Sequence, residues 1–132
     1  MRLLSFLLIC AAFAPIPAHS QAVVDHFVGP TTGPGFRDGA GAQARFNAPE
    51  GVWADAENVY IADSQNAVIR KIVLGTGQVS TLAGSPQETK PFSNPRALWG
   101  DGKFLYVADS SVIQKVDLAT GALFAVRRPM VP

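Results

Sequence analysis

The 132-residue chain contains one cysteine, Cys10, and two histidines. Cys10 lies in the apolar segment at the start of the chain, so the sequence from residue 21 onward has no cysteine for a disulfide bond or a thiol nucleophile. His26 is the only histidine in that part, which leaves neither a histidine-rich metal site nor a Ser-His-Asp triad with support. We therefore predict no catalytic residues, no metal site and no cofactor, and a fold that is stabilised by packing.

An excess of positive charge is also missing. Without Arg2, which belongs to the apolar leader, the eleven basic residues become ten and balance the ten acidic ones. The longest basic runs are two pairs, residues 70–71 and 127–128. A protein that binds a phosphate backbone needs clustered Lys and Arg to displace counterions. The sequence therefore predicts no nucleic-acid partner.

Long apolar runs are confined to the first residues. Arg2 precedes an apolar run from Leu3 to Phe13, and the small residues Ala18 and Ser20 follow it, which is the pattern of a secretory signal peptide. A membrane span needs about 20 apolar residues, and this run is about half that length. We predict a signal peptide over residues 1–20, cleavage before residue 21, and a secreted or periplasmic protein with no membrane contact after removal of the signal.

The sequence repeats itself at a distance of 46 residues, and after residue 64 the distance falls to 44. The pairs at 46 are Phe46 and Phe92, Pro49 and Pro95, Trp53 and Trp99, Asp55 and Asp101, Tyr60 and Tyr106, Ala62 and Ala108, and Asp63 and Asp109. The pairs at 44 are Ile69 and Ile113, Lys71 and Lys115, Leu74 and Leu118, Thr76 and Thr120, and Gly77 and Gly121. The second copy therefore has a loop that is two residues shorter.

Each copy contains four short segments that are rich in β-branched and aromatic residues and are separated by Gly, Asp or Asn. In the first copy they are residues 51–54, 59–62, 67–73 and 78–83, and in the second 97–100, 104–108, 112–117 and 122–126. None of them has helical periodicity. Four short strands in a unit of about 45 residues are typical of a β-propeller blade. We predict an all-β fold with two four-stranded blades.

The residues of the first copy carry a family resemblance. They are Ala44 to Gly51, Asn58 to Asp63, Asn66, Ile69 to Ile72, and Thr81 to Gly84. This pattern resembles the NHL-repeat β-propeller family over nearly all of residues 23–127, and we place the repeats at about 36–84 and 85–127 of a domain over residues 21–132. The second copy departs from it, because Ala97 replaces a glycine and the loop after Asp109 lacks the Asn and Arg that follow Asp63.

We expect the propeller that the resemblance implies to be incomplete in this chain. Phe27, Val28 and Gly29 echo residues 82–84, which predicts an additional N-terminal strand near residues 23–29 that ends a preceding unit. Two blades and one strand leave two apolar sheet faces uncovered, whereas closed propellers have about four to eight blades. Two explanations remain open: a reading frame that continues beyond residue 132, or a homo-oligomer in which three copies complete a six-bladed ring.

Three further features have structural explanations. The glycine-rich stretch from Gly33 to Gly41 is not followed by the Lys-Ser/Thr pair or the helix of a phosphate-binding loop, and we expect a connection between blades. The repeated aspartates are typical of turns, in which short side chains bond nearby backbone amides. Trp53 and Trp99 lie on the first strand of each copy, where we expect them to pack between blades.

The polar residues on or near loops are the candidates for function, because ligands of propellers bind at loops around the axis. We predict binding residues at Arg37, Arg45, Asn47, Gln65, Asn66 and Arg70. The export signal, the neutral charge and the lack of a catalytic constellation favour a secreted, non-enzymatic binding or scaffold module for a protein, peptide or glycan. The alternative that the resemblance implies is the N-terminal part of a lyase-like or lactonase-like propeller enzyme with its catalytic residues on other blades.

Overall fold

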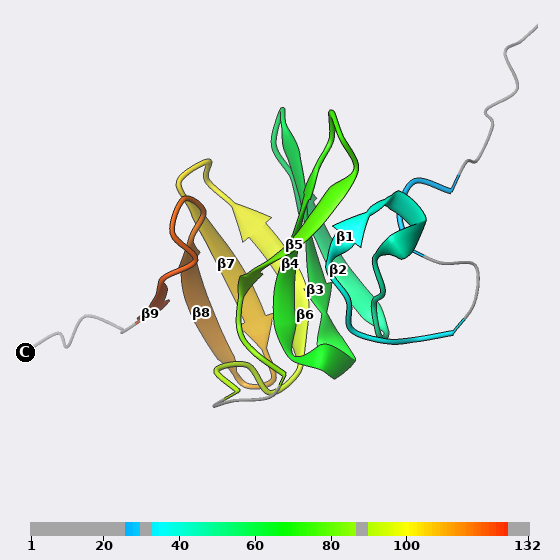
Figure 1. Ribbon diagram of the computed structural model, residues 1–132. Helices are drawn as coiled ribbons and strands as arrows, with labels where there is room; N and C mark the ends of the chain where they lie inside the picture. The colour runs from blue at the N-terminus through cyan, green and yellow to red at the C-terminus, as the bar shows by residue number, and fades with distance from the viewer. Residues whose placement is uncertain (1–25, 30–32, 87–89, 127–132) are drawn as a thin grey trace, which may run out of the picture.

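The computed structural model describes residues 26–29, 33–86 and 90–126. Over these residues the chain forms two antiparallel sheets and two short 3-10 helices, with no α-helix and hence no helix that could cross a membrane (Figure 1). The strand order is β1-β5-β4-β3-β2 in the first sheet and β6-β7-β8-β9 in the second. The predicted signal peptide lies outside the described residues.

Each sheet corresponds to one copy of the repeat. The first copy forms β2 (Pro49–Ala54), β3 (Asn58–Asp63), β4 (Val68–Val73) and β5 (Gln78–Ala83), and the second forms β6 (Pro95–Gly100), β7 (Phe104–Asp109), β8 (Val112–Asp117) and β9 (Leu123–Ala125). The two sheets also share their register, since Trp53 lies opposite Tyr60 and Trp99 lies opposite Tyr106. The predicted all-β fold with propeller blades is confirmed.

An aspartate at the end of each first strand shapes the turn that follows. The Oδ1 atom of Asp55 accepts bonds from the backbone N–H groups of Glu57 and Asn58, at 2.9 and 2.7 Å. Asp101 accepts the equivalent bonds from Lys103 and Phe104, also at 2.9 and 2.7 Å. Short carboxylate side chains close tight turns in this way. The sequence repeat thus encodes the same hairpin twice.

The two blades pack face to face, with their first strands β2 and β6 side by side (Figure 1). A Cβ atom added at Gly100 would lie 2.6 Å from the indole of Trp53, so the bare glycine allows this tryptophan to pack flat on the next blade. Gly51 faces the carbonyl of Arg96 so closely that an added Cβ atom would lie 2.3 Å from its oxygen. The core between the blades buries Tyr60, Ala62, Ala67, Ile69, Ala83, Phe92, Leu105, Val107 and Val116.

The far face of the second blade remains exposed. Trp99, the counterpart of Trp53, has 60% of its surface accessible, and Ile113 and Phe124 are also exposed. Val52, near the start of the first blade, is 63% exposed. Within the described part of the chain, no third sheet covers either face. The blades therefore do not close a ring.

The additional strand of the first sheet is not where the sequence predicts it. Residues 23–25 of the predicted strand lie outside the described residues, and residues 26–29 form no strand. The extra strand is β1 (Gly39–Ala40), which pairs with the outer strand β5, followed by the 3-10 helix η1 (Gly41–Gln43). The glycines supply the physical reason: Gly39 and Gly41 have φ angles of 147° and 51°, and this freedom allows the connection to fold back along the sheet edge.

Candidate functional site

The predicted binding residues gather where β3 passes into β4 and where the chain enters the first blade. We call this region the loop end; it consists of residues 35–38, 44–48 and 64–67. The 3-10 helix η2 (Ser64–Asn66) forms the connection between β3 and β4. The hairpin turns β2–β3, β4–β5, β6–β7 and β8–β9 lie at the opposite end of the antiparallel strands, and we call that region the turn end (Figure 1).

Arg70 is the centre of the loop end and is completely buried. Its Nη1 atom donates to Oδ2 of Asp63 and to the carbonyl oxygen of Arg45, both at 2.9 Å. Its Nη2 atom donates to Oδ1 of Asp38 at 2.7 Å and to the carbonyl oxygen of Arg37 at 2.8 Å. A buried guanidinium needs charged and polar partners to offset its loss of hydration. Here one side chain joins β3, β4 and the connection that precedes the blade.

Two aromatic rings complete the surroundings of this guanidinium. The centroids of Phe36 and Phe46 lie 5.0 and 4.9 Å from the Cζ atom of Arg70. At this distance the ring faces attract a cation, with an effect of about 1 kcal/mol. The Arg70–Asp63 ion pair is fully buried, whereas the side chain of Asp38 is 46% exposed. Arg70 is therefore a structural residue that holds the loops in place, rather than a group that a ligand can reach.

Asn66 has a similar role, while Gln65 beside it faces solvent. The Nδ2 atom of Asn66 donates to the carbonyl oxygen of Gly35 at 2.9 Å and to Oδ2 of Asp63 at 2.8 Å. Asn47 is held through its backbone: its N–H donates to Oδ1 of Asp63 at 2.7 Å, and its carbonyl oxygen accepts from the N–H of Gln65 at 3.1 Å. The side chain of Gln65 is exposed.

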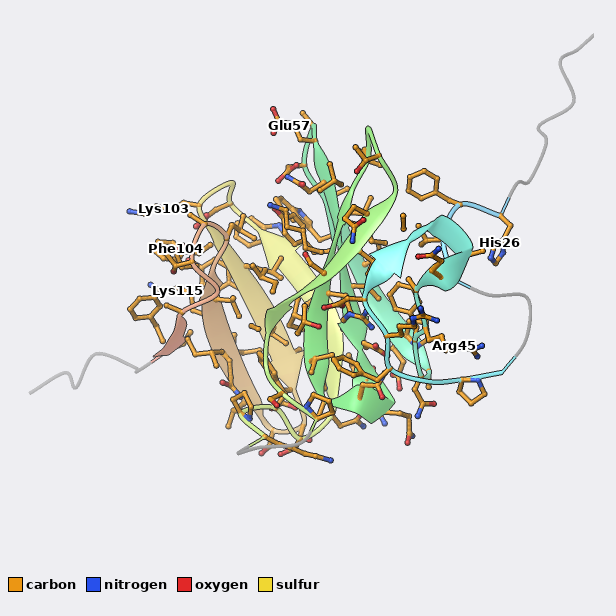
Figure 2. All side chains as sticks on the ribbon, in the orientation of Figure 1. His26, Arg45, Glu57, Lys103, Phe104 and Lys115 are labelled. Carbon is orange, nitrogen blue, oxygen red and sulfur yellow. The ribbon has the colours of Figure 1, made fainter. Side chains whose placement is uncertain are left out.

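Arg37 and Arg45 lie opposite each other in an isolated antiparallel bridge. They exchange both backbone hydrogen bonds, at 3.3 and 2.9 Å, so their side chains leave the backbone on the same face. Arg37 is exposed, and the half-buried Arg45 runs along the backbone of Gly35. Figure 2 shows Arg45 at the outer edge of the molecule, on the side of His26. All six predicted residues thus belong to one network, in which two are buried and Arg37 and Gln65 are the most accessible.

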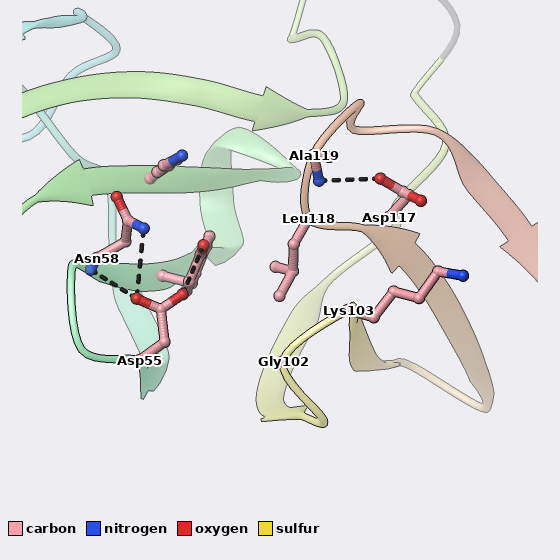
Figure 3. A pocket seen from close by; sticks show the side chains of 9 residues that line it. Asp55, Asn58, Gly102, Lys103, Asp117, Leu118 and Ala119 are labelled. Carbon is pink, nitrogen blue, oxygen red and sulfur yellow. Dashed lines mark hydrogen bonds between the residues drawn. The ribbon is translucent and has the colours of Figure 1, made fainter.

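A pocket at the turn end was not predicted from the sequence. It has a volume of about 360 Å³ and lies between the blades (Figure 3). Its lining consists of Asp55, Asn58, Tyr60 and Lys71 from the first blade and Gly102, Lys103, Asp117, Leu118 and Ala119 from the second. These turns are far apart in sequence and meet only after the sheets have packed. Nothing in the sequence marks this cavity, because its two walls belong to different blades.

The charges around the pocket are stabilised by local bonds. Burial opposes the charged form of Asp55, but N–H donors from Glu57 and Asn58 and the hydroxyl of Tyr60 outweigh it and hold the pKa of Asp55 below its ordinary value of 3.8. Burial and the Asp55 carboxylate together raise the pKa of Tyr60 to about 12. Backbone bonds from Thr120 and Ala119 lower the pKa of Asp117. At neutral pH both aspartates are ionised and Tyr60 is a neutral donor.

Part of this chain is similar to known NHL repeat proteins, although no family model matches it. Over 51 residues, 39% of the chain, it is 45% identical to NHL repeat-containing protein 2 of Homo sapiens and of Bos taurus. The protein of the same name from Gallus gallus is 44% identical over 50 residues. The aligned stretch spans only 7% of the length of each of these relatives. The predicted resemblance to NHL repeats is confirmed over this stretch.

A solved structure shares the fold. It is an auxiliary nutrient binding protein from Bacteroides ovatus, with a TM-score of 0.53 and 23% sequence identity. The likeness covers 63% of this chain and 25% of the other. At this level of identity the comparison shows a common arrangement of strands and supports the assignment of the two sheets as propeller blades.

Proposed function

We propose that this chain, which carries NHL-type repeats, is a secreted or periplasmic binding or scaffold module that contacts a protein, peptide or glycan through its loop end. The similarity to NHL repeat proteins and the nutrient binding role named for the structural neighbour support a binding role rather than an enzymatic one. The signal-peptide pattern of residues 1–20 supports the location.

The observation that carries this proposal is the arrangement around Arg70. Its guanidinium fixes the backbone carbonyls of Arg37 and Arg45, so these two residues present their side chains from an ordered bridge. Gln65 is held beside them by the carbonyl of Asn47. Binding groups on an ordered backbone lose little conformational entropy when a ligand binds. The loop end therefore has the properties of a preorganised contact surface.

A screen on peptide and glycan arrays tests the proposal with residues 21–132 as the probe. Ligands that bind should lose at least about tenfold in affinity when Arg37 and Gln65 are both replaced by alanine, because their polar contacts disappear. Lys115→Ala, at a distance from the loop end, is the matched control and should bind normally. The proposal fails if no ligand depends on the loop residues, or if the protein turns over a substrate in a manner that a loop substitution abolishes.

The exposure of Trp99 favours a second role, assembly of copies into a larger propeller. Trp53 packs on Gly100 of the next blade, and Trp99 is free to do the same with another blade. The position equivalent to Gly100 in the first blade is Ala54, whose methyl group argues against an identical contact between copies. Light scattering on residues 21–132 tests this role: a trimer supports a six-bladed ring, and a cooperatively melting monomer overturns it.

A further inference from the structure

The first blade has an apolar pocket on the face that does not contact the second blade; we call such a face a free face. The pocket has a volume of about 150 Å³ and is lined by Val28, Phe46, Pro49, Ile61 and Ile72. The last four of these recur in the second blade at the distances of the sequence repeat, as Phe92, Pro95, Val107 and Val116. There all four are buried, and three of them belong to the core between the blades. The apolar pocket is therefore the uncovered counterpart of a surface that the first blade covers on the second.

Ile69 shows which side chain fills this surface within the chain. It is completely buried and belongs to the core cluster that also contains Phe92 and Val116. Its counterpart Ile113 is 49% exposed on the free face of the second blade. A surface and its complement at different places on one chain allow a head-to-tail contact between identical copies.

The strand edges beside these two positions are also complementary. β5 continues to the residue opposite Ile69, whereas β9 pairs only with residues 114–116 of β8. Ile113 therefore has no strand beside it on that side among the residues that the structure describes. On the first blade, residues 27–29 run past the apolar pocket, with Val28 in its wall. A copy that offers its pocket thus also offers backbone for the unpaired edge at Ile113 of another copy.

The free face of the second blade carries a cation and aromatic rings at the turn end. The Nζ atom of Lys115 lies 4.2 Å from the ring centroid of Phe104 and 5.6 Å from that of Phe124. Asn58 and Ser80 occupy these two ring positions in the first blade. Figure 2 shows Lys115 and Phe104 at the outer side of the second blade. An acidic group and an apolar side chain would complement this cluster.

The first blade has both groups at the corresponding turns. Within the chain, Lys103 and Leu118 of the second blade line the pocket at the turn end. Their counterparts in the first blade are Glu57, at the tip of the β2–β3 hairpin, and Leu74, which is 40% exposed (Figure 2). Between copies, Glu57 therefore approaches Lys115, whereas the corresponding residues within the chain are both lysines. Opposite charges at this point favour the contact between copies.

Two methyl groups set the spacing of the first strands. Gly51 faces a backbone carbonyl of the second blade so closely that an added Cβ atom would lie 2.3 Å from its oxygen, yet its counterpart is Ala97. The glycine on which Trp53 packs, Gly100, has the counterpart Ala54. Both methyl groups lie on β2 and β6, so these strands must be farther apart between copies than within the chain. The contact therefore depends on the later strands of each blade.

We propose that the apolar pocket binds a second copy of this chain, with Ile113 of one copy in the pocket of the next. The inference rests on the second role proposed above, the assembly of copies, and assigns Ile113 rather than Trp99 as its anchor. A volume of about 150 Å³ accommodates one aliphatic side chain. Because the contact is head-to-tail, each copy uses its pocket and its isoleucine with different neighbours.

Sedimentation velocity on residues 21–132 over a range of concentrations measures this contact. Association should weaken at least about tenfold in Ile113→Asp, because the pocket would have to bury a carboxylate without a partner. Ile113→Val is the conservative control and should associate as the unchanged chain does. Ala54→Gly combined with Ala97→Gly should strengthen association at least about tenfold, because β2 and β6 of neighbouring copies can then approach. A melting curve of each variant shows whether its fold is intact.

The outcomes separate this contact from the role on which it rests. A chain that stays monomeric at every concentration overturns both. If the chain associates and folded Ile113→Asp associates equally well, the assembly role stands and the contact at the pocket is overturned. Arg37 and Gln65 are unchanged in these variants, so ligand binding at the loop end is tested separately.

Cross-linking locates the contact directly, since residues 21–132 contain no cysteine. Copies with Ile113→Cys are mixed with copies that carry Ile61→Cys and are treated with a short bismaleimide. This mixture should yield a cross-linked heterodimer. Ile113→Cys mixed with Gly75→Cys, in the β4–β5 turn at the opposite end of the strands, should not. Equal yields from the two mixtures would overturn the proposed arrangement of the copies.

Discussion

Gln114 occupies in the second blade the position that Arg70 occupies in the first, and it donates to the same kinds of acceptor. Arg70 bonds to Asp63 and to the carbonyl of Arg45, and Gln114 bonds to Asp109 at 3.0 Å and to the carbonyl of Pro91. The neutral amide has no second donor arm comparable to Nη2, which in Arg70 reaches Asp38. Arg70 and Gln114 thus make the same bonds to an aspartate and a backbone carbonyl. Arg70 in addition binds Asp38, which lies in the segment that precedes the first blade.

Arg70→Met should lower the free energy of unfolding by about 3 to 5 kcal/mol, because it leaves the buried Asp63 carboxylate without its counter-charge. Arg70→Gln should lower it by less, since an amide can retain the bonds found at Gln114. Urea denaturation measures both. Gln114→Met is the control and should cost about 1 to 3 kcal/mol, for the loss of a neutral donor. If Arg70→Met and Arg70→Gln lowered the free energy of unfolding equally, the bonds that Arg70 and Gln114 have in common would not stabilise the first blade.

Gly100→Ala should destabilise the chain by about 1 to 3 kcal/mol, because the new methyl group would lie 2.6 Å from the Trp53 indole. Gly75→Ala is the control, since no atom lies within 4 Å of the added Cβ atom there. Chemical denaturation of the unchanged protein, Gly100→Ala, Trp53→Phe and the double variant gives the coupling energy between the two positions. A cost of Gly100→Ala that persists in full with Trp53→Phe would show that the tryptophan is not the cause.

The two tryptophans should respond differently to truncation. Trp53→Ala should cost about 3 kcal/mol, because it removes packing between the blades. Trp99→Ala should change the free energy of unfolding of a monomer by less than about 0.5 kcal/mol, since its surface is exposed. Thermal melting and light scattering are measured together on each variant. A large loss with Trp99→Ala, accompanied by dissociation, would instead show that this face is buried in an oligomer.

Stability should fall at alkaline pH through Tyr60. Its pKa is raised to about 12 in the folded chain from an ordinary value of 10.0, because burial and the Asp55 carboxylate favour the neutral phenol. The neutral Tyr60 phenol stabilises the folded chain fully below pH 10, and this stabilisation is lost as the pH rises through 12. The reason is that Tyr60 loses its proton at a lower pH in the unfolded chain than in the folded chain. The free energy of unfolding is measured against pH for Tyr106→Phe and for the double variant of Tyr106→Phe and Tyr60→Phe. The difference between the two profiles is the contribution of Tyr60. The double variant should have a flatter pH profile over this range, and identical profiles would refute the assignment.

The position of the strands could be predicted because their signals are local. Short segments rich in β-branched and aromatic residues, separated by Gly, Asp or Asn, mark the strands, and Asp55 and Asp101 mark the turns after the first strands. The eight blade strands therefore begin within two residues of the predicted segments. The extra strand was misplaced for the opposite reason. Gly39 and Ala40 carry no strand pattern, and they pair with β5 only because the folded sheet offers an unoccupied edge.

The candidate site, too, could be predicted only in part from the sequence. The sequence identified Arg37, Gln65 and Arg70 as polar residues near loops, but it gave no means to distinguish the buried cation from the exposed groups. That distinction depends on Asp38, Asp63 and two carbonyls that converge on one guanidinium from separate segments. The pocket beside Lys71 had no sequence signature, because its walls belong to different blades.

The sequence by itself determined the repeat, the four strands of each blade and the hairpin turns, since these follow from side chains within a few residues of one another. Tertiary structure alone decided which equivalent residues differ in role. Trp53 is covered and Trp99 is exposed, and Lys71 faces a pocket while Lys115 lies on phenyl rings. The physical reason is that packing between sheets acts on one face of each blade, so identical local sequences have different neighbours.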